Sequence, residues 1–144
     1  MTGIQVVATD LSKVYAGQTI VNPFSFNFFP GSVTGVSGPN GSGKSTLSGV
    51  LAGKEDYEIT SGEVIFNGKN LFDMPAEDRA REGLFLAFQY PIEIPGVSSI
   101  NFLKTAINEI REYKGLESIP AKDFLSLVKE KQKLVELDGK LANR

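Results

Sequence analysis

The chain has 144 residues, the size of one ordinary domain, and its 41% hydrophobic and 22% charged residues are typical of a globular protein. It contains no cysteine and no histidine, which excludes disulfides, thiolate metal sites and histidine-based acid–base catalysis within it. The net charge of −2 and the lack of a basic stripe argue against nucleic acid as a partner. No apolar run is long enough to insert into a membrane, and the N-terminus lacks the pattern of a secretory signal.

Short apolar segments at the beginning of the chain predict strands. Residues 4–8 are apolar and β-branched, as in a short strand. Residues 19–29 place Phe24, Phe26 and Phe28 at every second position, with polar residues between them. This alternation is typical of a strand with one buried face.

A strand, a glycine-rich loop and a helix follow in that order. Residues 33–36 are apolar and predict a strand that leads into the loop GPNGSGKST. Residues 45–52 then predict a helix, and Gly53 is a natural helix end.

The middle of the chain predicts further strands and one short helix. Residues 57–66 indicate a strand, a turn and a second strand, followed by a turn at 67–68. Pro75 is expected to open a helix with two acidic residues in its first turn. Residues 84–88 are almost entirely apolar, as expected of a strand buried on both faces, and Gln89 follows at its end.

The last third of the chain changes to a helical pattern. Apolar residues recur at steps of three and four over 99–113 and again over 121–137. Prolines and a glycine between 91 and 96 indicate an irregular connection before these helices. The economical fold class is therefore α/β, with a helical appendage after the strands.

The loop after residues 33–36 carries the most specific pattern. Gly38, Gly43, Lys44 and Ser45 satisfy G-x-x-x-x-G-K-[ST] in the required setting of strand, loop and helix. Glycines let main-chain N–H groups point at phosphate oxygens, and the helix start adds its positive dipole end. The lysine would neutralise phosphate charge, and the Ser45 hydroxyl would ligate Mg²⁺. The predicted nucleotide-binding residues are Gly38, Pro39, Asn40, Gly41, Ser42, Gly43, Lys44, Ser45 and Thr46.

Two residues outside the loop are further candidates. Gln89, just past a predicted buried strand, could reach Mg²⁺ or the attacking water, and the alternative is an ordinary glutamine at a strand end. Tyr15 could stack on adenine, and the alternative is a tyrosine of the core or surface.

The strings around the loop resemble a known family. GPNGSGKSTL is written as in ABC ATPases, and AGKEDYE and FQYPIEIPGVS are similar to SufC, the ATPase family of the Suf iron–sulfur cluster assembly system, from about Gly38 to Arg144. The resemblance implies a partial ABC ATPase domain, with a β-rich phosphate-loop core over 1–90 and an incomplete helical subdomain over 91–144. It implies ATP and Mg²⁺ as cofactors, a cytoplasmic location, and a catalytic and Mg²⁺-positioning role for Gln89.

The same resemblance implies partners. Residues after Gln89 would face scaffold proteins similar to SufB and SufD, and ATP would drive dimerisation in the complete family. By contrast, residues 1–37 resemble transporter-type ABC ATPases, in which Tyr15 matches the adenine-stacking aromatic. Two sequences joined at the phosphate loop would give this pattern.

The resemblance also implies missing parts. The family would continue past Arg144 into its signature motif, the Walker B carboxylate, the catalytic glutamate and a switch histidine. We therefore expect weak nucleotide binding, negligible turnover and poor solubility, because residues 33–36 would lack a neighbouring strand. The alternatives are a nucleotide-binding subunit of a membrane transporter and a catalytically silent fragment.

Overall fold

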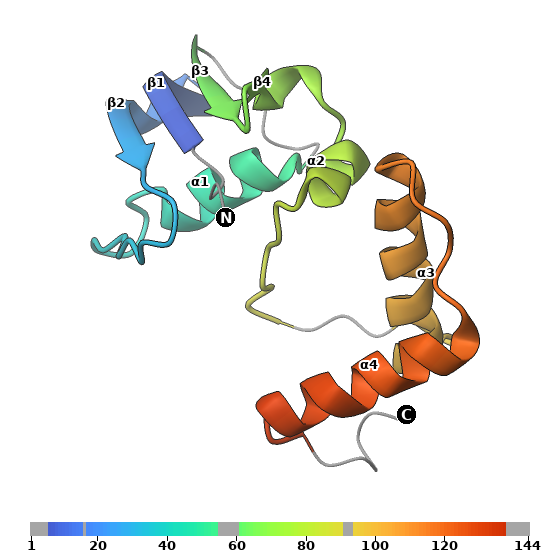
Figure 1. Ribbon diagram of the computed structural model, residues 1–144. Coiled ribbons are helices and arrows are strands. Elements are labelled where there is room, and N and C mark those ends of the chain that lie inside the picture. Colours follow the sequence, from blue (N-terminus) through green and yellow to red (C-terminus); the bar gives the residue numbers. More distant parts are fainter. Residues whose placement is uncertain (1–5, 16, 55–60, 91–93, 138–144) are drawn as a thin grey trace. The chain divides into compact units, whose positions relative to one another are not determined.

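A computed structural model describes residues 6–15, 17–54, 61–90 and 94–137. The chain divides into two compact units, Met1–Ala87 and Phe88–Arg144. Among the described residues, the first unit contains the four strands and the second contains the two longest helices (Figure 1).

The first unit is built on an antiparallel sheet with the strand order β2-β1-β3-β4. The strands are β1 (Val6–Tyr15), β2 (Gln18–Phe28), β3 (Ser61–Phe66) and β4 (Lys69–Asn70). Asn67 and Gly68 join the last two strands, and both have positive φ angles, 51° and 79°. Two such residues form the tight turn whose twist matches that of the strands, which confirms the turn predicted at 67–68.

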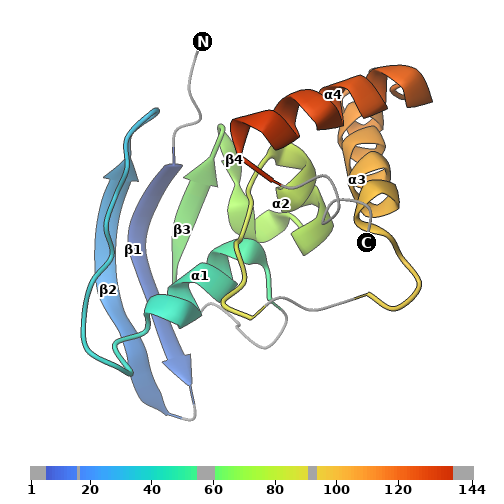
Figure 2. The ribbon, with the colours of Figure 1, turned by 90° about the horizontal axis from the view of Figure 1, so that it is seen from below.

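Helices of the first unit pack on this sheet. α1 (Lys44–Ala52) lies across one face of the strands (Figures 1 and 2), and a 3₁₀ turn, η1 (Leu71–Asp73), precedes α2 (Ala76–Glu82). Leu47 and Leu51 of α1 pack against a core whose buried residues are Ala8, Leu11, Val64, Phe66 and Leu71. The apolar side chains that α1 turns toward the sheet therefore hold it there.

A β-bulge interrupts β1 at Asp10. On the β3 side, Asp10 and Leu11 together oppose Gly62 alone, between the pairs Thr9–Glu63 and Ser12–Ser61. Asp10 has a φ of 47°, and its N–H donates to the Ser25 Oγ of β2 at 3.0 Å. The extra residue bends the strand and fixes the register against both neighbours.

The second unit contains α3 (Ser99–Tyr113) and α4 (Ala121–Leu134). The Asn108 Oδ1 accepts a hydrogen bond from Ile119 N at 2.9 Å, and the Arg111 Nε donates to Glu117 O at 2.6 Å. Both bonds tie α3 to the connection that leads into α4. Phe124 is the buried side chain of α4, with 1% of its surface exposed.

Much of the predicted secondary structure is confirmed. The mixed α/β architecture with an antiparallel sheet is present, and α1, α2 and α3 lie where the patterns placed them. α4 ends at Leu134, three residues before the predicted end. Of the strand pair predicted over 57–66, only 61–66 lies within the described residues, as β3. No helix in the described ranges is both long and apolar enough to cross a bilayer.

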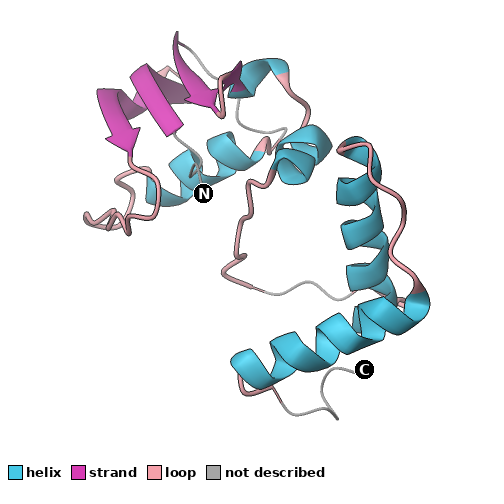
Figure 3. Cartoon of the chain, in the orientation of Figure 1, coloured by secondary structure: helices cyan, strands magenta, loops and turns pink. Residues whose placement is uncertain are grey.

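Two predicted strands are wrong. Residues 33–36 and 84–88 belong to no strand in the structure, and both segments are drawn as loop (Figure 3). Val33 is fully exposed, and Phe85 is 89% exposed although residues 84–88 were expected to form a strand buried on both faces. A strand exists only where a neighbour completes its hydrogen-bond ladder, and none of β1–β4 pairs with either segment.

The bulge generates a prediction for Gly62→Ala. A Cβ at Gly62, whose φ is +93°, would lie 2.5 Å from Asp10 O, which is backbone and cannot move away. We expect the free energy of unfolding to fall by about 2–4 kcal/mol. Gly68→Ala is the matched control, because its φ is +79° but nothing lies within 4 Å. Urea unfolding followed by circular dichroism should show the smaller loss, about 1–2 kcal/mol, for Gly68→Ala. Equal losses for the two variants would contradict the role of the bulge.

Candidate phosphate-binding site

The loop before α1 is compact and turned. Gly41 and Gly43 have φ angles of 81° and 88°, a region that glycine enters without steric cost. Ser42 N donates to Pro39 O at 3.3 Å, which closes a tight turn within the loop. The two glycines therefore let the chain reverse direction immediately before the helix begins.

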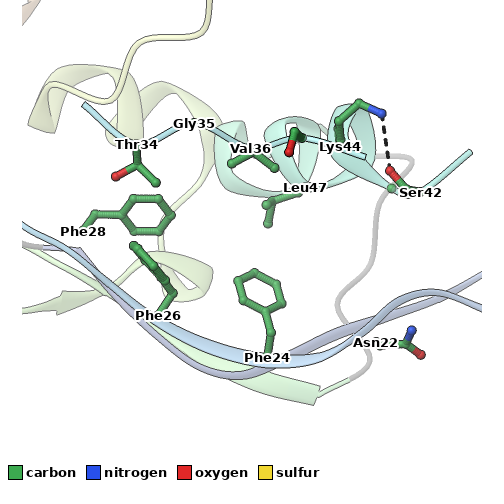
Figure 4. A pocket seen from close by; sticks show the side chains of 12 residues that line it. Asn22, Phe24, Phe26, Phe28, Thr34, Gly35, Val36, Ser42, Lys44 and Leu47 are labelled. Atoms are coloured by element: carbon green, nitrogen blue, oxygen red, sulfur yellow. Dashed lines mark hydrogen bonds between the residues drawn. The ribbon is translucent and has the colours of Figure 1, made fainter. Parts of the chain in front are cut away.

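Lys44 closes this loop with its own side chain. Its Nζ donates to Gly38 O and Pro39 O, each at 2.8 Å, and approaches the Ser42 Oγ at 3.3 Å (Figure 4 draws the last contact). An ammonium group has three donors, and these three oxygens all belong to the loop. The positive charge is thus held at the loop, six residues along the chain from Gly38.

The first turn of α1 leaves N–H groups without helix acceptors. The first helical bond runs from Leu47 N to Gly43 O at 2.8 Å, so the N–H groups of residues 44–46 have no carbonyl within the helix. No side chain caps this end, and its first turn contains no acidic residue. The N–H groups and the positive dipole end therefore favour a bound anion.

The site offers little to a metal ion by itself. Ser45 is exposed in the first turn of α1, where its hydroxyl can serve as one ligand. Among the described residues, no group of three acidic, histidine or cysteine side chains could hold a metal. Mg²⁺ would suit this site only with phosphate oxygens and water as its other ligands, which is how the ion is commonly held in nucleotide sites.

An open, mostly apolar pocket of about 510 Å³ is lined in part by Ser42, Gly43 and Lys44 of the loop. Phe24, Phe26 and Phe28 point into it from β2, and Val36 and Leu47 line the opposite side (Figure 4). The Phe26 and Phe28 rings meet edge to face at 4.8 Å. The predicted alternation along residues 19–29 is therefore present, with Ser25 and Asn27 exposed. The predicted burial of the phenylalanine face is wrong, because Phe26 is 43% exposed in the open pocket.

The other two candidate residues stay predictions. Tyr15 ends β1, but its side chain lies outside the described part of the structure. Gln89 is exposed and belongs to the second unit, whereas the loop belongs to the first. The structure thus brings together residues 38–46, and it tests neither Tyr15 nor Gln89.

The sequence analysis missed Arg79, which no sequence pattern singled out. Its side chain hydrogen-bonds to carbonyl groups at the C-terminal end of α1.

A turned glycine loop that is closed by a lysine at an uncapped helix start defines a phosphate-loop protein. The sequence profile described as "ABC transporter" matches residues 21–139. This chain belongs to the ABC transporter ATPase family.

Three curated relatives show the similarity. "Probable ATP-dependent transporter SufC" of Escherichia coli (strain K12) is 50% identical over 94% of this chain and 54% of its own length. "Probable ATP-dependent transporter ycf16" of Cyanophora paradoxa is 47% identical over 89% of this chain and 49% of its own. "Probable ATP-dependent transporter slr0075" of Synechocystis sp. (strain ATCC 27184 / PCC 6803 / Kazusa) is 44% identical over 94% and 53%.

These matches set the extent of the resemblance. The chain spans about half the length of the curated relatives it matches. The resemblance was predicted to begin at about Gly38, and this bound is wrong: the match to SufC covers 94% of the chain and so begins upstream of Gly38. A solved bacterial Atm1-family ABC exporter with ATP bound is 22% identical over 55% of this chain and 14% of its own, with a TM-score of 0.49. The family assignment rests on the sequence matches.

Close packing inside the loop predicts the effect of Gly38→Ala. A Cβ at Gly38 would lie 2.7 Å from the Ser42 Oγ and 3.3 Å from its Cβ. We expect this variant to bind a fluorescent ATP analogue about tenfold more weakly, which corresponds to about 1.4 kcal/mol. Adding Ser42→Ala removes the closer atom and should restore part of the affinity. Gly35→Ala, with nothing within 4 Å, is the control and should bind as the unaltered chain does. Strictly additive losses in the double variant would contradict the packing argument.

Proposed function

We propose that this chain binds Mg²⁺-ATP through residues 38–46 and forms the ATP-binding part of an ATPase subunit of iron–sulfur cluster assembly. The observation that carries the nucleotide assignment is the Lys44 ammonium, held at the loop by Gly38 O and Pro39 O. It places a fixed positive charge beside the free N–H groups of α1, which suits a polyphosphate.

The assignment of roles follows from the chemistry of the residues. Loop and helix N–H groups would bind phosphate oxygens, and Lys44 would neutralise their charge. The Ser45 hydroxyl would ligate Mg²⁺, and Thr46 could donate a further hydrogen bond. Gln89 would position water or the metal, and Tyr15 would stack on adenine. The bound Mg²⁺ would supply charge neutralisation on the phosphates.

The iron–sulfur assignment rests on the SufC resemblance and on composition. The relative that is 50% identical bears the name SufC. The chain has no cysteine, which agrees with a role as the motor of assembly and not as the cluster's scaffold. Such a protein would work in the cytoplasm, where ATP is available.

A second candidate is a nucleotide-binding subunit of a membrane transporter. The names of the relatives include the word transporter. The transporter-like strings in residues 1–37 favour this candidate only weakly, because the match to SufC covers 94% of the chain and includes most of that segment. The two candidates share the phosphate loop and differ in the partner of the second unit. For a SufC-type subunit, the partner would be a scaffold similar to SufB or SufD, with ATP-driven dimerisation. For a transporter subunit, it would be a membrane protein.

Lys44→Ala tests the nucleotide assignment. Removing the ammonium deletes a charge-assisted contact to phosphate and the bonds that close the loop. We expect the affinity for labelled ATP in the presence of Mg²⁺ to fall about 10- to 100-fold. Lys129→Ala, an exposed lysine on α4, is the control and should bind unchanged. Equal ATP binding by Lys44→Ala would refute the role of the loop, and no ATP turnover above background is expected from either variant.

A pull-down tests the partner. The tagged chain should capture a scaffold similar to SufB or SufD, and replacing exposed Phe102 and Leu103 of α3 with serine should weaken capture at least about fivefold. Val33→Ser removes an even more exposed apolar side chain, from the first unit, and should leave capture unchanged. Capture of a transporter membrane subunit in place of the scaffold would favour the second candidate.

A further inference from the structure

Arg79 is a buried arginine whose partners are carbonyl groups. It lies on α2 with only 7% of its surface exposed. Its Nη1 donates to Val50 O at 2.8 Å and to Leu51 O at 3.2 Å, and its Nε donates to Met74 O at 2.8 Å. Two of these carbonyls belong to the last turn of α1. The guanidinium therefore ties α2 to the end of the helix that begins at the phosphate loop.

This contact satisfies a physical need of α1. The last carbonyl groups of a helix have no N–H donor within the helix, and this C-terminal end carries a negative partial charge. The N–H of Gly53 donates to Gly49 O and Val50 O, and the Arg79 guanidinium places a full positive charge at the same end of the helix. Burial lowers the pKa of the Arg79 guanidinium, which nevertheless remains charged at neutral pH. Burying a cation costs desolvation free energy that an apolar residue would not. The hydrogen bonds from Arg79 to the carbonyl groups must therefore be well placed to offset that cost.

Packing at the same place leaves little room for movement. A Cβ on Gly53, which has a φ of +82°, would lie 3.0 Å from the Ala76 Cα and 3.3 Å from the Arg79 Cζ. The Arg79 Cζ also lies 5.9 Å from the centre of the Phe72 ring, within the range of a cation–π contact. The guanidinium is thus fixed from several sides, and the end of α1 is fixed with it.

The opposite end of α1 is held in a different way. No side chain caps it, Lys44 hydrogen-bonds to Gly38 O and Pro39 O of the loop, and Leu47 packs on the core of the sheet. A helix of nine residues is about 13 Å long, so a tilt of about 5° at the anchored end moves the other end by about 1 Å. A displacement of that size is enough to spoil a binding geometry.

We propose that Arg79 is a positioning residue for the phosphate site: by holding the C-terminal carbonyls of α1 it keeps Lys44 and the first-turn N–H groups in place for a nucleotide. The proposal rests on nucleotide binding by the loop. Arg79 touches no nucleotide atom in this scheme and acts entirely through α1.

The test compares Arg79→Met and Arg79→Lys in the full chain. Two measurements are made: affinity for a fluorescent ATP analogue with Mg²⁺, corrected for the folded fraction, and amide hydrogen exchange of Leu47 and Ser48 without nucleotide. We expect Arg79→Met to bind about tenfold more weakly and to exchange faster at these amides. Arg79→Lys keeps the charge but has no planar fork, so it should recover part of both losses.

A control separates positioning from loss of stability. Gly62→Ala strains β3 against Asp10, in a contact that includes no residue of α1. It should lower stability but leave affinity per folded molecule unchanged. Arg79→Met with unaltered affinity per folded molecule, or with unaltered exchange at Leu47, would overturn the proposal. If Arg79→Met fails to fold, Arg79→Lys decides by the same two measurements.

The outcome also distinguishes this proposal from the proposed function. If the unaltered chain binds no ATP analogue, the nucleotide assignment fails, and the exchange measurement alone decides on Arg79. Faster exchange at the start of α1 in Arg79→Met would still support anchoring of the helix. Unchanged exchange would overturn it.

Discussion

The hydrogen bonds from the Lys44 ammonium to Gly38 O and Pro39 O are the interaction on which the candidate site depends. A loop that binds an anion must turn its N–H groups outward, which leaves its carbonyl oxygens crowded together. The ammonium binds those oxygens and offsets their mutual repulsion. One side chain thus stabilises the shape of the loop and supplies the charge that an anion requires.

The two ends of α1 differ in how their main-chain groups are satisfied, and this difference leaves the N-terminal N–H groups available to bind an anion. Gly53 and Arg79 satisfy the C-terminal carbonyls, while the N-terminal end has no side-chain cap. Leu47 and Leu51 hold the helix to the core of the sheet. Because packing and the C-terminal contacts stabilise α1, its N-terminal N–H groups need not be satisfied by the protein itself.

The phosphate loop and most helices could be predicted because their determinants are local. The G-x-x-x-x-G-K-[ST] spacing fixes the loop, the glycine at 53 ends α1, and the three- and four-residue steps fix α3. Arg79 could not be found in this way, because its partners at 50 and 51 are almost thirty residues earlier in the chain. The bulge at Asp10 likewise depends on two neighbouring strands at once, which no pattern within β1 shows.

The two wrong strands show what a local pattern leaves out. Residues 33–36 and 84–88 have the composition of buried strands, but composition does not provide the neighbour that completes a ladder. The exposed Val33 and Phe85 then contribute nothing to burial, so the core of the first unit is small and its stability depends on few side chains. A ligand that binds only the folded loop adds to stability in proportion to RT ln(1 + [L]/Kd). In a unit with so small a core, phosphate binding therefore raises the free energy of unfolding. The residues that hold α1 in place influence both the affinity for phosphate and the stability of the fold.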